Sequence, residues 1–264
     1  MKVAILCGGK GTRLREETEI RPKPLVKIGD APILWHIMKL YSHYGFNEFI
    51  LCLGYKGEAI REYILNLEVM SNDFTLVFGG ERRLILETRR HLDPWTITCV
   101  DTGEETPTGG RLFRIKDYIK DDDFMVTYGD GVSDVNIADI YKFHKATGKK
   151  ATLTAVNPST AFGIVEVENN LAKSFKEKPQ LEGMINGGFF VFSRDVFSYL
   201  REDSVLEAEP LRKLAEEKQL AAYTHHGFWY CMDTFKQVEE LRRMYSEGRT
   251  PWMVWGNGPG QPRE

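Results

Sequence analysis

The sequence contains few cysteines, no long apolar run and no excess of charge of either sign. Its four cysteines lie far apart, at positions 7, 52, 99 and 231, without CxxC spacing or the density of a disulfide-stabilised chain. We therefore expect buried thiols in a reducing cytoplasm. No stretch approaches the length of a membrane span, and the five apolar residues before the first glycine are too few for a signal peptide. The sequence predicts a cytoplasmic protein with no membrane partner.

Charge is nearly balanced, with 35 Lys and Arg against 38 Asp and Glu. Basic residues cluster only in pairs such as Arg82-Arg83 and Arg89-Arg90. A nucleic-acid-binding surface typically needs a basic patch or stripe, which this pattern does not offer. We therefore expect small-molecule partners and no nucleic acid.

The first 65 residues alternate strand and helix patterns. Apolar runs at 3–7 and 48–53 predict buried strands, and amphipathic segments at 32–45 and 57–66 predict helices. This order favours a Rossmann-like α/β fold, with three α/β/α layers and a mixed, mostly parallel sheet. Ligands of such sheets lie at the carboxyl ends of the strands.

Other segments change this pattern. Three short strand-like runs within residues 67–100, without helices between them, predict an inserted hairpin or an extension of the sheet. Two alternating strands about Asn169-Asn170 predict a second hairpin. Thr108 is a plausible N-cap for a helix that follows. Further strands are expected at 124–128, 150–156 and 184–193, and further helices at 136–148, 195–200, 210–218 and after 234.

A glycine-rich loop follows the first predicted strand. Gly8, Gly9 and Gly11 lack Cβ atoms, so backbone N–H groups can approach anionic oxygens closely. The spacing matches neither GxGxxG nor GxxxxGK, and a tight turn that needs positive φ is the alternative. Arg13 within the loop favours phosphate binding, since a turn has no need of a guanidinium.

Two more charged positions are set apart by their neighbours. Lys23 lies between two prolines, which fix φ and present the ammonium at a defined place; a stiffened loop with a solvated lysine is the alternative. Asp130 lies between two glycines, directly after the predicted strand 124–128. Its carboxylate is therefore expected at the ligand-bearing edge of the sheet.

These motifs together resemble a known family. GGKGTRL followed by RPKPLVKIGDAPIL is similar to the signature of the sugar-1-phosphate nucleotidyltransferases, or NDP-sugar pyrophosphorylases. Further motifs match in register: TYGDG at 127–131, FKEKP at 175–179, INGGFFVF at 185–192 and FWYCMDT at 228–234. The resemblance implies one nucleotidyltransferase domain over 1–255, with a nucleotide half at about 1–135 and a sugar-phosphate half at about 136–245 that includes a sugar-binding β subdomain. Residues 256–264 are expected to form a disordered tail.

The family joins a nucleoside triphosphate to a sugar 1-phosphate. A phosphate oxygen attacks the α-phosphorus in line and pyrophosphate leaves, assisted by Mg²⁺ and without a protein nucleophile. The sequence is most similar to members that use CTP and glucose 1-phosphate, through the EET after GTRLR and through VDTG followed by TGGRL. The resemblance therefore implies formation of CDP-glucose, for deoxysugar or surface-polysaccharide precursors, by a homo-oligomer.

The resemblance also implies roles for individual residues. Arg13 would bind the β- and γ-phosphates of the leaving pyrophosphate, and Lys23 would bridge the phosphates of both substrates. Asp130 and Asp233 are the implied Mg²⁺ ligands. The implied nucleotide-binding residues are Leu6, Gly8, Gly9, Gly11, Thr12, Arg13, Lys23, Thr106, Gly110, Arg111 and Gly129, and the implied sugar-phosphate-binding residues are Glu177, Lys178, Asn186 and Gly187.

Three alternatives stay open. The base or sugar could differ, with UTP or dTTP in place of CTP, because cytosine can be recognised by backbone carbonyls that a sequence does not reveal. A catalytically silent sugar-nucleotide-binding regulatory subunit is disfavoured because the charged residues that catalysis needs are all present, namely Arg13, Lys23, Asp130, Lys178 and Asp233. A glycosyltransferase would need an acidic motif after a strand, whereas DDD at 121–123 precedes one.

Several residues receive a structural interpretation instead. Cys7 is expected to pack and not to act as a nucleophile, and His225 and His226 should point to opposite faces of a strand. Asp233 could cap the last helix in addition to binding metal. Arg15 matches no motif position. Residues 67–100 and the segment PWMVW at 251–255 are candidate subunit contacts, and the lack of a hexapeptide repeat predicts a stand-alone catalytic domain.

Overall fold

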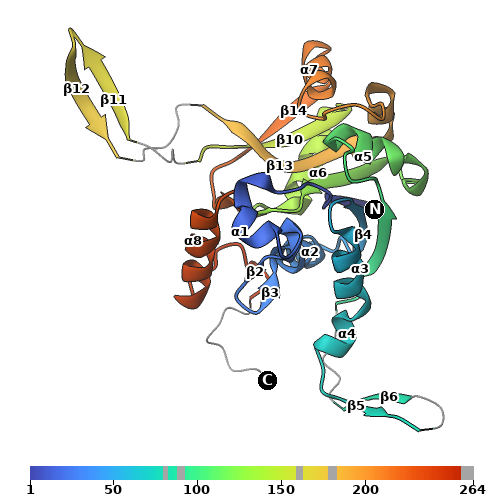
Figure 1. Ribbon diagram of the computed structural model, residues 1–264. Helices are drawn as coiled ribbons and strands as arrows, with labels where there is room; N and C mark the ends of the chain where they lie inside the picture. Colours follow the sequence, from blue (N-terminus) through green and yellow to red (C-terminus); the bar gives the residue numbers. More distant parts are fainter. Residues whose placement is uncertain (80–82, 88–92, 159–162, 178–182, 257–264) are drawn as a thin grey trace.

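A seven-stranded mixed sheet forms the centre of the protein in the computed structural model, which describes residues 1–79, 83–87, 93–158, 163–177 and 183–256 (Figure 1). β13 is antiparallel to its neighbours β8 and β10, and the other adjacent pairs are parallel. The prediction of a mixed, mostly parallel sheet is confirmed. The strand order is β14 (Leu220–His225), β10 (Ala151–Val156), β13 (Ile185–Ser193), β8 (Asp123–Tyr128), β1 (Lys2–Leu6), β4 (Glu48–Leu53) and β7 (Thr96–Asp101).

The central strand β1 shows why its sequence is apolar at successive positions. Val3 and Ile5 pack into one buried cluster, whereas Ala4 and Leu6 pack into another. Successive side chains of a strand point to opposite faces, so both faces of the sheet are covered. The three-layer prediction is confirmed.

Each face is covered by its own set of helices. The first buried cluster receives apolar side chains from α2 (Ile33–His43), α3 (Gly57–Leu65), α6 (Ile137–Thr147) and α8 (Phe235–Ser246). The second receives them from α5 (Thr108–Arg114), the 3₁₀ helix η4 (Arg194–Tyr199) and α7 (Glu209–Glu216). Residues 195–200, predicted to be helical, thus lie mostly in a 3₁₀ helix.

Short elements join these layers near the strand ends. They are η1 (Thr12–Leu14), α1 (Arg15–Thr18), η2 (Lys23–Leu25), α4 (Leu67–Met70) and η3 (Lys116–Tyr118). Two further two-stranded sheets pair β2 (Lys27–Ile28) with β3 (Ala31–Pro32) and β9 (Gly131–Ser133) with β15 (Trp229–Cys231). No helix within the described residues is long and apolar enough to cross a bilayer.

Two β-hairpins project from the body of the protein, at opposite sides in Figure 1. One pairs β5 (Phe74–Val77) with β6 (Arg83–Leu86), and the other pairs β11 (Ile164–Glu168) with β12 (Leu171–Lys176). The second turns at Asn169-Asn170, whose φ angles of 49° and 63° are the left-handed values of a type I′ turn. Both hairpins were predicted, and β7 adds the predicted extension of the main sheet.

The structure corrects two predictions about individual residues. Pro107, not Thr108, occupies the N-cap of α5, and the Thr108 hydroxyl instead donates to Glu207 Oε2 at 2.7 Å. Thr234, not Asp233, caps α8, through a capping box with Gln237. Trp252 of the PWMVW segment is 1% exposed and packs against core aromatic rings, so this side chain belongs to the core; Met253, Val254 and Trp255 are partly exposed, and the subunit contact expected of the segment stays a prediction. Of the predicted tail, 257–264 lie outside the described residues.

Candidate active site

Two adjoining pockets open where β1 and β8 end, at the edge of the sheet that the α/β pattern predicts. The first has a volume of about 330 Å³ and the second about 360 Å³. Tyr128, Asp130 and Asp233 line both pockets, so they mark the boundary between them. An arrangement of two joined pockets suits two substrates that must meet.

Most of the residues predicted to bind substrates line these pockets. The first pocket is lined by Leu6, Gly8, Gly9, Gly11, Thr12, Arg13, Lys23, Thr106, Arg111 and Gly129 from the predicted nucleotide set, and the second by Asn186 and Gly187 from the predicted sugar-phosphate set. Gly110 and Glu177 are absent from both linings. Lys178 lies outside the described residues.

The glycines of the first loop serve different purposes. Gly11 has φ of 62°, in the left-handed region where glycine carries little strain. A Cβ at Gly8 would lie 1.9 Å from Arg111 Nη1, so this glycine leaves room for the arginine. Gly9 has no heavy atom within 4 Å of its Cβ position and faces open space. The loop is therefore shaped partly by a tight turn and partly by Arg111.

Arg111 joins the glycine loop to the neighbouring strand ends. Its Nη2 donates to Gly8 O at 2.9 Å and to Glu104 O at 3.0 Å, and its Nη1 donates to Leu53 O, Thr102 Oγ1 and Gly103 O. The side chain is buried, and this burial lowers the pKa of its guanidinium. The resemblance implies that Arg111 binds nucleotide, whereas the structure directs these Nη donors to protein oxygens.

Gly110, which the resemblance implies to bind nucleotide, and its neighbour Gly109 permit close packing of the chain. A Cβ at Gly110 would lie 2.1 Å from Glu202 O, and one at Gly109 would lie 2.8 Å from Ser204 O. The start of α5 therefore approaches the segment at 202–206, and only residues without a side chain fit there.

A cluster of opposite charges lies at the boundary of the two pockets. Lys23 Nζ is 2.5 Å from Asp130 Oδ2 and 2.6 Å from Asp233 Oδ1. Arg13 Nη1 lies 3.1 Å from Asp233 Oδ2. Burial on its own would lower the pKa of Lys23, but the two carboxylates raise it, and the net shift is upward. The ammonium therefore stays charged between two carboxylates.

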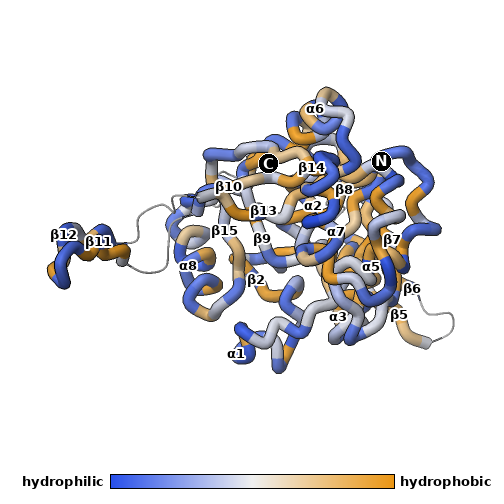
Figure 2. Tube along the Cα trace, turned by 90° about the horizontal axis from the view of Figure 1, so that it is seen from above, coloured by the Kyte–Doolittle hydropathy of each residue, from blue (hydrophilic) through white to orange (hydrophobic). Residues whose placement is uncertain are grey.

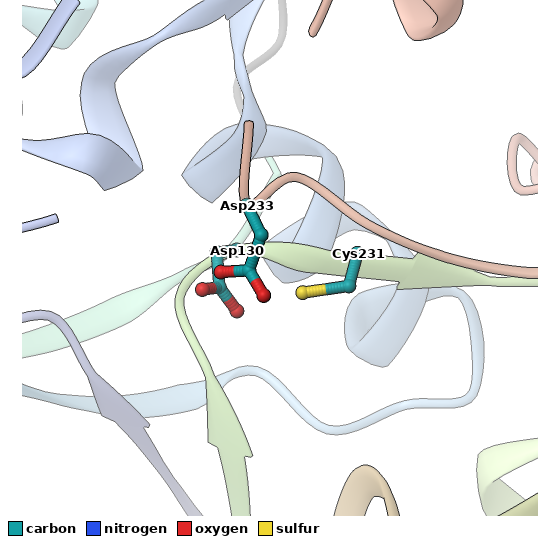
Figure 3. Close-up of side chains that lie close together, drawn as sticks. All are labelled: Asp130, Cys231 and Asp233. Atoms are coloured by element: carbon teal, nitrogen blue, oxygen red, sulfur yellow. The ribbon is translucent and has the colours of Figure 1, made fainter. Parts of the chain in front are cut away.

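The two carboxylates fit a divalent cation. Ligand atoms of Asp130, Asp233 and Cys231 lie within 4.8 Å of one another, and Figure 3 shows the three side chains converging. Mg²⁺ is typically held by one or two carboxylates together with substrate phosphates and water. The Lys23 ammonium already lies between the carboxylates, which shows that their separation suits a positive charge.

Cys231 was missed as a site residue in the sequence. It ends β15, two residues before Asp233, and lines the second pocket. Burial, followed by the carboxylates of Asp130 and Asp233, raises the pKa of its thiol. The signal was available: side chains at alternate positions of an extended chain share a face, so the position two residues before Asp233, the implied metal ligand, is expected to face the same site.

Tyr128 was also missed, although it links the two pockets. Its hydroxyl donates to the carboxylate of Glu207 and accepts from Asn186 Nδ2 at 3.2 Å. Burial, followed by Glu207, raises the pKa of the phenol, which therefore stays protonated at neutral pH. The amide of Asn186, which lines the second pocket, is fixed at both ends, because its Oδ1 also accepts from Gly188 N at 2.9 Å.

Cys7 and His225 are consistent with their structural interpretation. Cys7 is 1% exposed, and burial raises the pKa of its thiol. His225 lies 2.9 Å from Asp134 Oδ1, whereas His226 is exposed. Arg15 is exposed on α1. The DDD motif leads into the start of β8, at the end of that strand away from Asp130.

Comparison with known proteins identifies the family of the chain. The family model described as "Nucleotidyl transferase" matches residues 2–245. A probable glucose-1-phosphate cytidylyltransferase of Bacillus subtilis is 47% identical over 258 residues, covering 97% of this chain and all of the relative. The glucose-1-phosphate cytidylyltransferase of Salmonella typhi is 48% identical with the same coverage.

Solved structures share the fold. HddC from Yersinia pseudotuberculosis superposes with a TM-score of 0.65 at 22% identity, over 92% of this chain and 99% of that one. An apo UDP-glucose pyrophosphorylase superposes with a TM-score of 0.66 at 15% identity, over 94% and 99% of the two chains. At these identities the likeness concerns the fold alone.

Proposed function

The chain belongs to the nucleotidyl transferase family, and we propose that it transfers a cytidylyl group from CTP to α-D-glucose 1-phosphate, giving CDP-glucose and pyrophosphate. The main structural support for nucleotidyl transfer is that Lys23 contacts both Asp130 and Asp233 at the boundary of the two pockets. The choice of CTP and glucose 1-phosphate is supported by relatives of that activity at 47% and 48% identity over 97% of the chain.

The first pocket holds the nucleotide in this proposal. The backbone of Gly8, Gly9, Gly11 and Thr12 binds the phosphates, and Leu6, Thr106 and Gly129 contact the rest of the nucleotide. Arg111 fixes the Gly8 carbonyl and the segment after β7, so the loop is organised before substrate arrives. Such preorganisation reduces the reorganisation that accompanies charge development. Gly110 contributes through the packing of α5.

Lys23 and Arg13 supply the positive charge. Lys23 lies at the boundary of the pockets, where it reaches the α-phosphate of CTP and the phosphate of the sugar. It stabilises the charge that develops during in-line attack, and Arg13 binds the leaving pyrophosphate. Asp130 and Asp233 hold Mg²⁺, which neutralises charge on the triphosphate when it is bound. No protein nucleophile is needed.

The second pocket holds glucose 1-phosphate. Asn186, oriented by its hydrogen bond to the Tyr128 hydroxyl, contacts the sugar hydroxyls, and Gly187 leaves room for the ring. The roles proposed for the next two residues are supported by the FKEKP motif alone. Glu177 accepts hydrogen bonds from the sugar hydroxyls, and Lys178 pairs with the sugar phosphate.

The surface supports a homo-oligomer. Val167, Leu171 and Phe175 of the second hairpin are 68%, 73% and 64% exposed. A lone two-stranded hairpin is marginally stable, so these apolar side chains favour cover by another copy of the chain. Figure 2 shows how far β11 and β12 extend from the body.

The proposal keeps a single nucleotidyltransferase domain over 1–255, because one seven-stranded sheet runs through both the nucleotide and the sugar-phosphate halves. We also place the protein in the cytoplasm. All four cysteines are unpaired thiols, which suits a reducing compartment.

A pyrophosphate-release assay tests the activity. CTP, UTP, dTTP, GTP and ATP are each paired with several sugar 1-phosphates in the presence of Mg²⁺. CTP with glucose 1-phosphate should give the highest kcat/KM, and a preference for UTP or dTTP would contradict the assigned base. Absence of turnover with every pair would favour a non-catalytic regulatory subunit.

A further inference from the structure

The thiol of Cys231 faces the same point as the two proposed Mg²⁺ ligands. Its sulfur and the carboxylate oxygens of Asp130 and Asp233 lie within 4.8 Å of one another. Figure 3 shows the sulfur directed toward the Asp233 carboxylate and not away from it. The three residues also line the second pocket together. A single cation in this position is therefore within reach of two oxygens and one sulfur.

Local strand geometry explains this placement. Met232 is fully buried in the core, so its neighbours Cys231 and Asp233 lie on the opposite, pocket-facing side of the chain. Cys231 is paired in register with Gly131, which has no side chain to cover the thiol. The Met232 amide donates to Asp130 O at 2.9 Å, which joins the two segments that carry the ligands.

A cation-binding role for this position has support that is independent of the sulfur. The Lys23 Nζ lies 2.5 Å from Asp130 Oδ2 and 2.6 Å from Asp233 Oδ1, so a positive charge already lies between the two carboxylates. Arg13 adds a second cation beside Asp233. The two carboxylates therefore already bind positive charge, and the Cys231 thiol is an additional donor beside them.

We propose that Cys231 determines metal specificity, by adding a soft third ligand through which the site binds Cd²⁺ and Zn²⁺ far more tightly than two carboxylates would. The inference rests on the proposed function only for the role of Asp130 and Asp233 as metal ligands. Mg²⁺ prefers oxygen ligands, so the sulfur stays outside its coordination sphere. Thiolates select soft ions. When Cd²⁺ or Zn²⁺ binds, a metal–sulfur bond forms, the S–H bond breaks and the proton goes to solvent.

A functional consequence follows from this donor set. Cd²⁺ and Zn²⁺ compete with Mg²⁺ for the same carboxylates but are held by one more bond. Low concentrations of these ions therefore displace Mg²⁺, and the protein becomes sensitive to thiophilic metals at the site of its proposed chemistry.

The test adds Cd²⁺ alone to the full-length protein and follows the ultraviolet charge-transfer band of a cadmium–thiolate bond. We expect a saturable band at one equivalent, its loss in Cys231→Ser and its retention in Cys99→Ser, which removes a partly buried thiol on β7. The affinity for Cd²⁺ relative to that for Mg²⁺ should fall at least about tenfold in Cys231→Ser. No band at saturating Cd²⁺, or an equal band in Cys231→Ser, would overturn the proposal.

A second measurement needs no variant and so does not depend on how the serine variant folds. Iodoacetamide labelling of Cys231 in the unmodified protein, read by mass spectrometry, should slow with Cd²⁺ and not with Mg²⁺. Equal labelling with and without Cd²⁺ would overturn the proposal. A Cd²⁺ band without CTP turnover would support the soft-metal site and contradict only the proposed function. CTP turnover without the band would support the proposed function and contradict the soft-metal site.

Discussion

At the scale of the residue, Lys23 has two different sets of partners, one in the free protein and one in the proposed complex with substrates. Without substrate its ammonium lies between Asp130 and Asp233. During the proposed reaction it contacts substrate phosphates while those carboxylates hold Mg²⁺. In the proposed reaction the same group therefore competes with metal in the free protein and assists nucleotidyl transfer in the complex.

Lys23→Met separates these two effects. We expect kcat to fall about 100-fold or more, because a cation that stabilises developing charge is removed. Mg²⁺ should bind the free variant several-fold more tightly, because no ammonium occupies the space between the carboxylates. Steady-state kinetics and isothermal titration calorimetry measure the two quantities. Lys27→Met, at an exposed lysine on β2, is the matched control, and weaker Mg²⁺ binding by Lys23→Met would contradict the competition.

Single residues also show the limits of the sequence. GGKGTRL, PKP and GDG pointed to Arg13, Lys23 and Asp130 because each motif places charge beside residues that restrict or free the backbone. Tyr128 and Cys231 lie inside the quoted motifs TYGDG and FWYCMDT but carry no charge that singles them out, and their roles depend on partners far along the chain. Arg111 was identified as a site residue, but its carbonyl partners could not be inferred from side-chain identities.

At the scale of the element, the ends of β1, β4 and β7 are joined by Arg111. Its guanidinium donates to oxygens that follow each of these strands or end them, including Gly8 O and Leu53 O. Loss of this group removes a shared charged donor from the three strand ends, although Gly8 O and Leu53 O keep the backbone N–H groups of Tyr55 and Thr102 as partners.

Arg111→Met should therefore lower the free energy of unfolding by about 2 kcal/mol, since hydrogen bonds from a charged donor typically contribute roughly 1.5–3 kcal/mol. It should also raise the KM for CTP, because the glycine loop loses its anchor. Denaturant unfolding and steady-state kinetics measure these effects. Arg212→Met on the exposed side of α7 is the control, and a variant as stable as the unmodified protein would contradict the role.

Elements were predicted well where the pattern was strong. The type I′ turn at Asn169-Asn170 and the buried runs of β1 and β4 follow from local preferences. The N-cap of α5 was wrong because Thr108 bonds to Glu207 and Leu206, which lie about a hundred positions away. Asp233 was wrongly offered as a cap because Thr234 and Gln237 form the capping box one residue later.

At the scale of the whole molecule, the two hairpins carry apolar side chains into solvent. The fold places them at opposite sides of the body in Figure 1. Within the sequence they are recognisable as hairpins, but their distance from the core is a property of the tertiary structure. Their exposure is what supports an assembly of several chains.

The double variant Val167→Glu with Leu171→Glu tests this assembly. The unmodified protein should elute as an oligomer in size-exclusion chromatography with light scattering, and the variant should shift to a smaller species, because two charges replace apolar contacts on β11 and β12. Lys173→Glu, at an exposed lysine of the same hairpin, is the control. A monomeric unmodified protein would contradict the oligomer.

The central claim is that Asp130 holds Mg²⁺ at the point where CTP and glucose 1-phosphate meet. The most direct measurement is the Mg²⁺ dependence of pyrophosphate release from this substrate pair by Asp130→Asn, with circular dichroism to confirm that the fold is intact. We expect kcat to fall about 100-fold or more, because the amide of the asparagine variant cannot supply the charge of a carboxylate ligand. Unchanged kinetics and an unchanged Mg²⁺ dependence in a folded variant would contradict it.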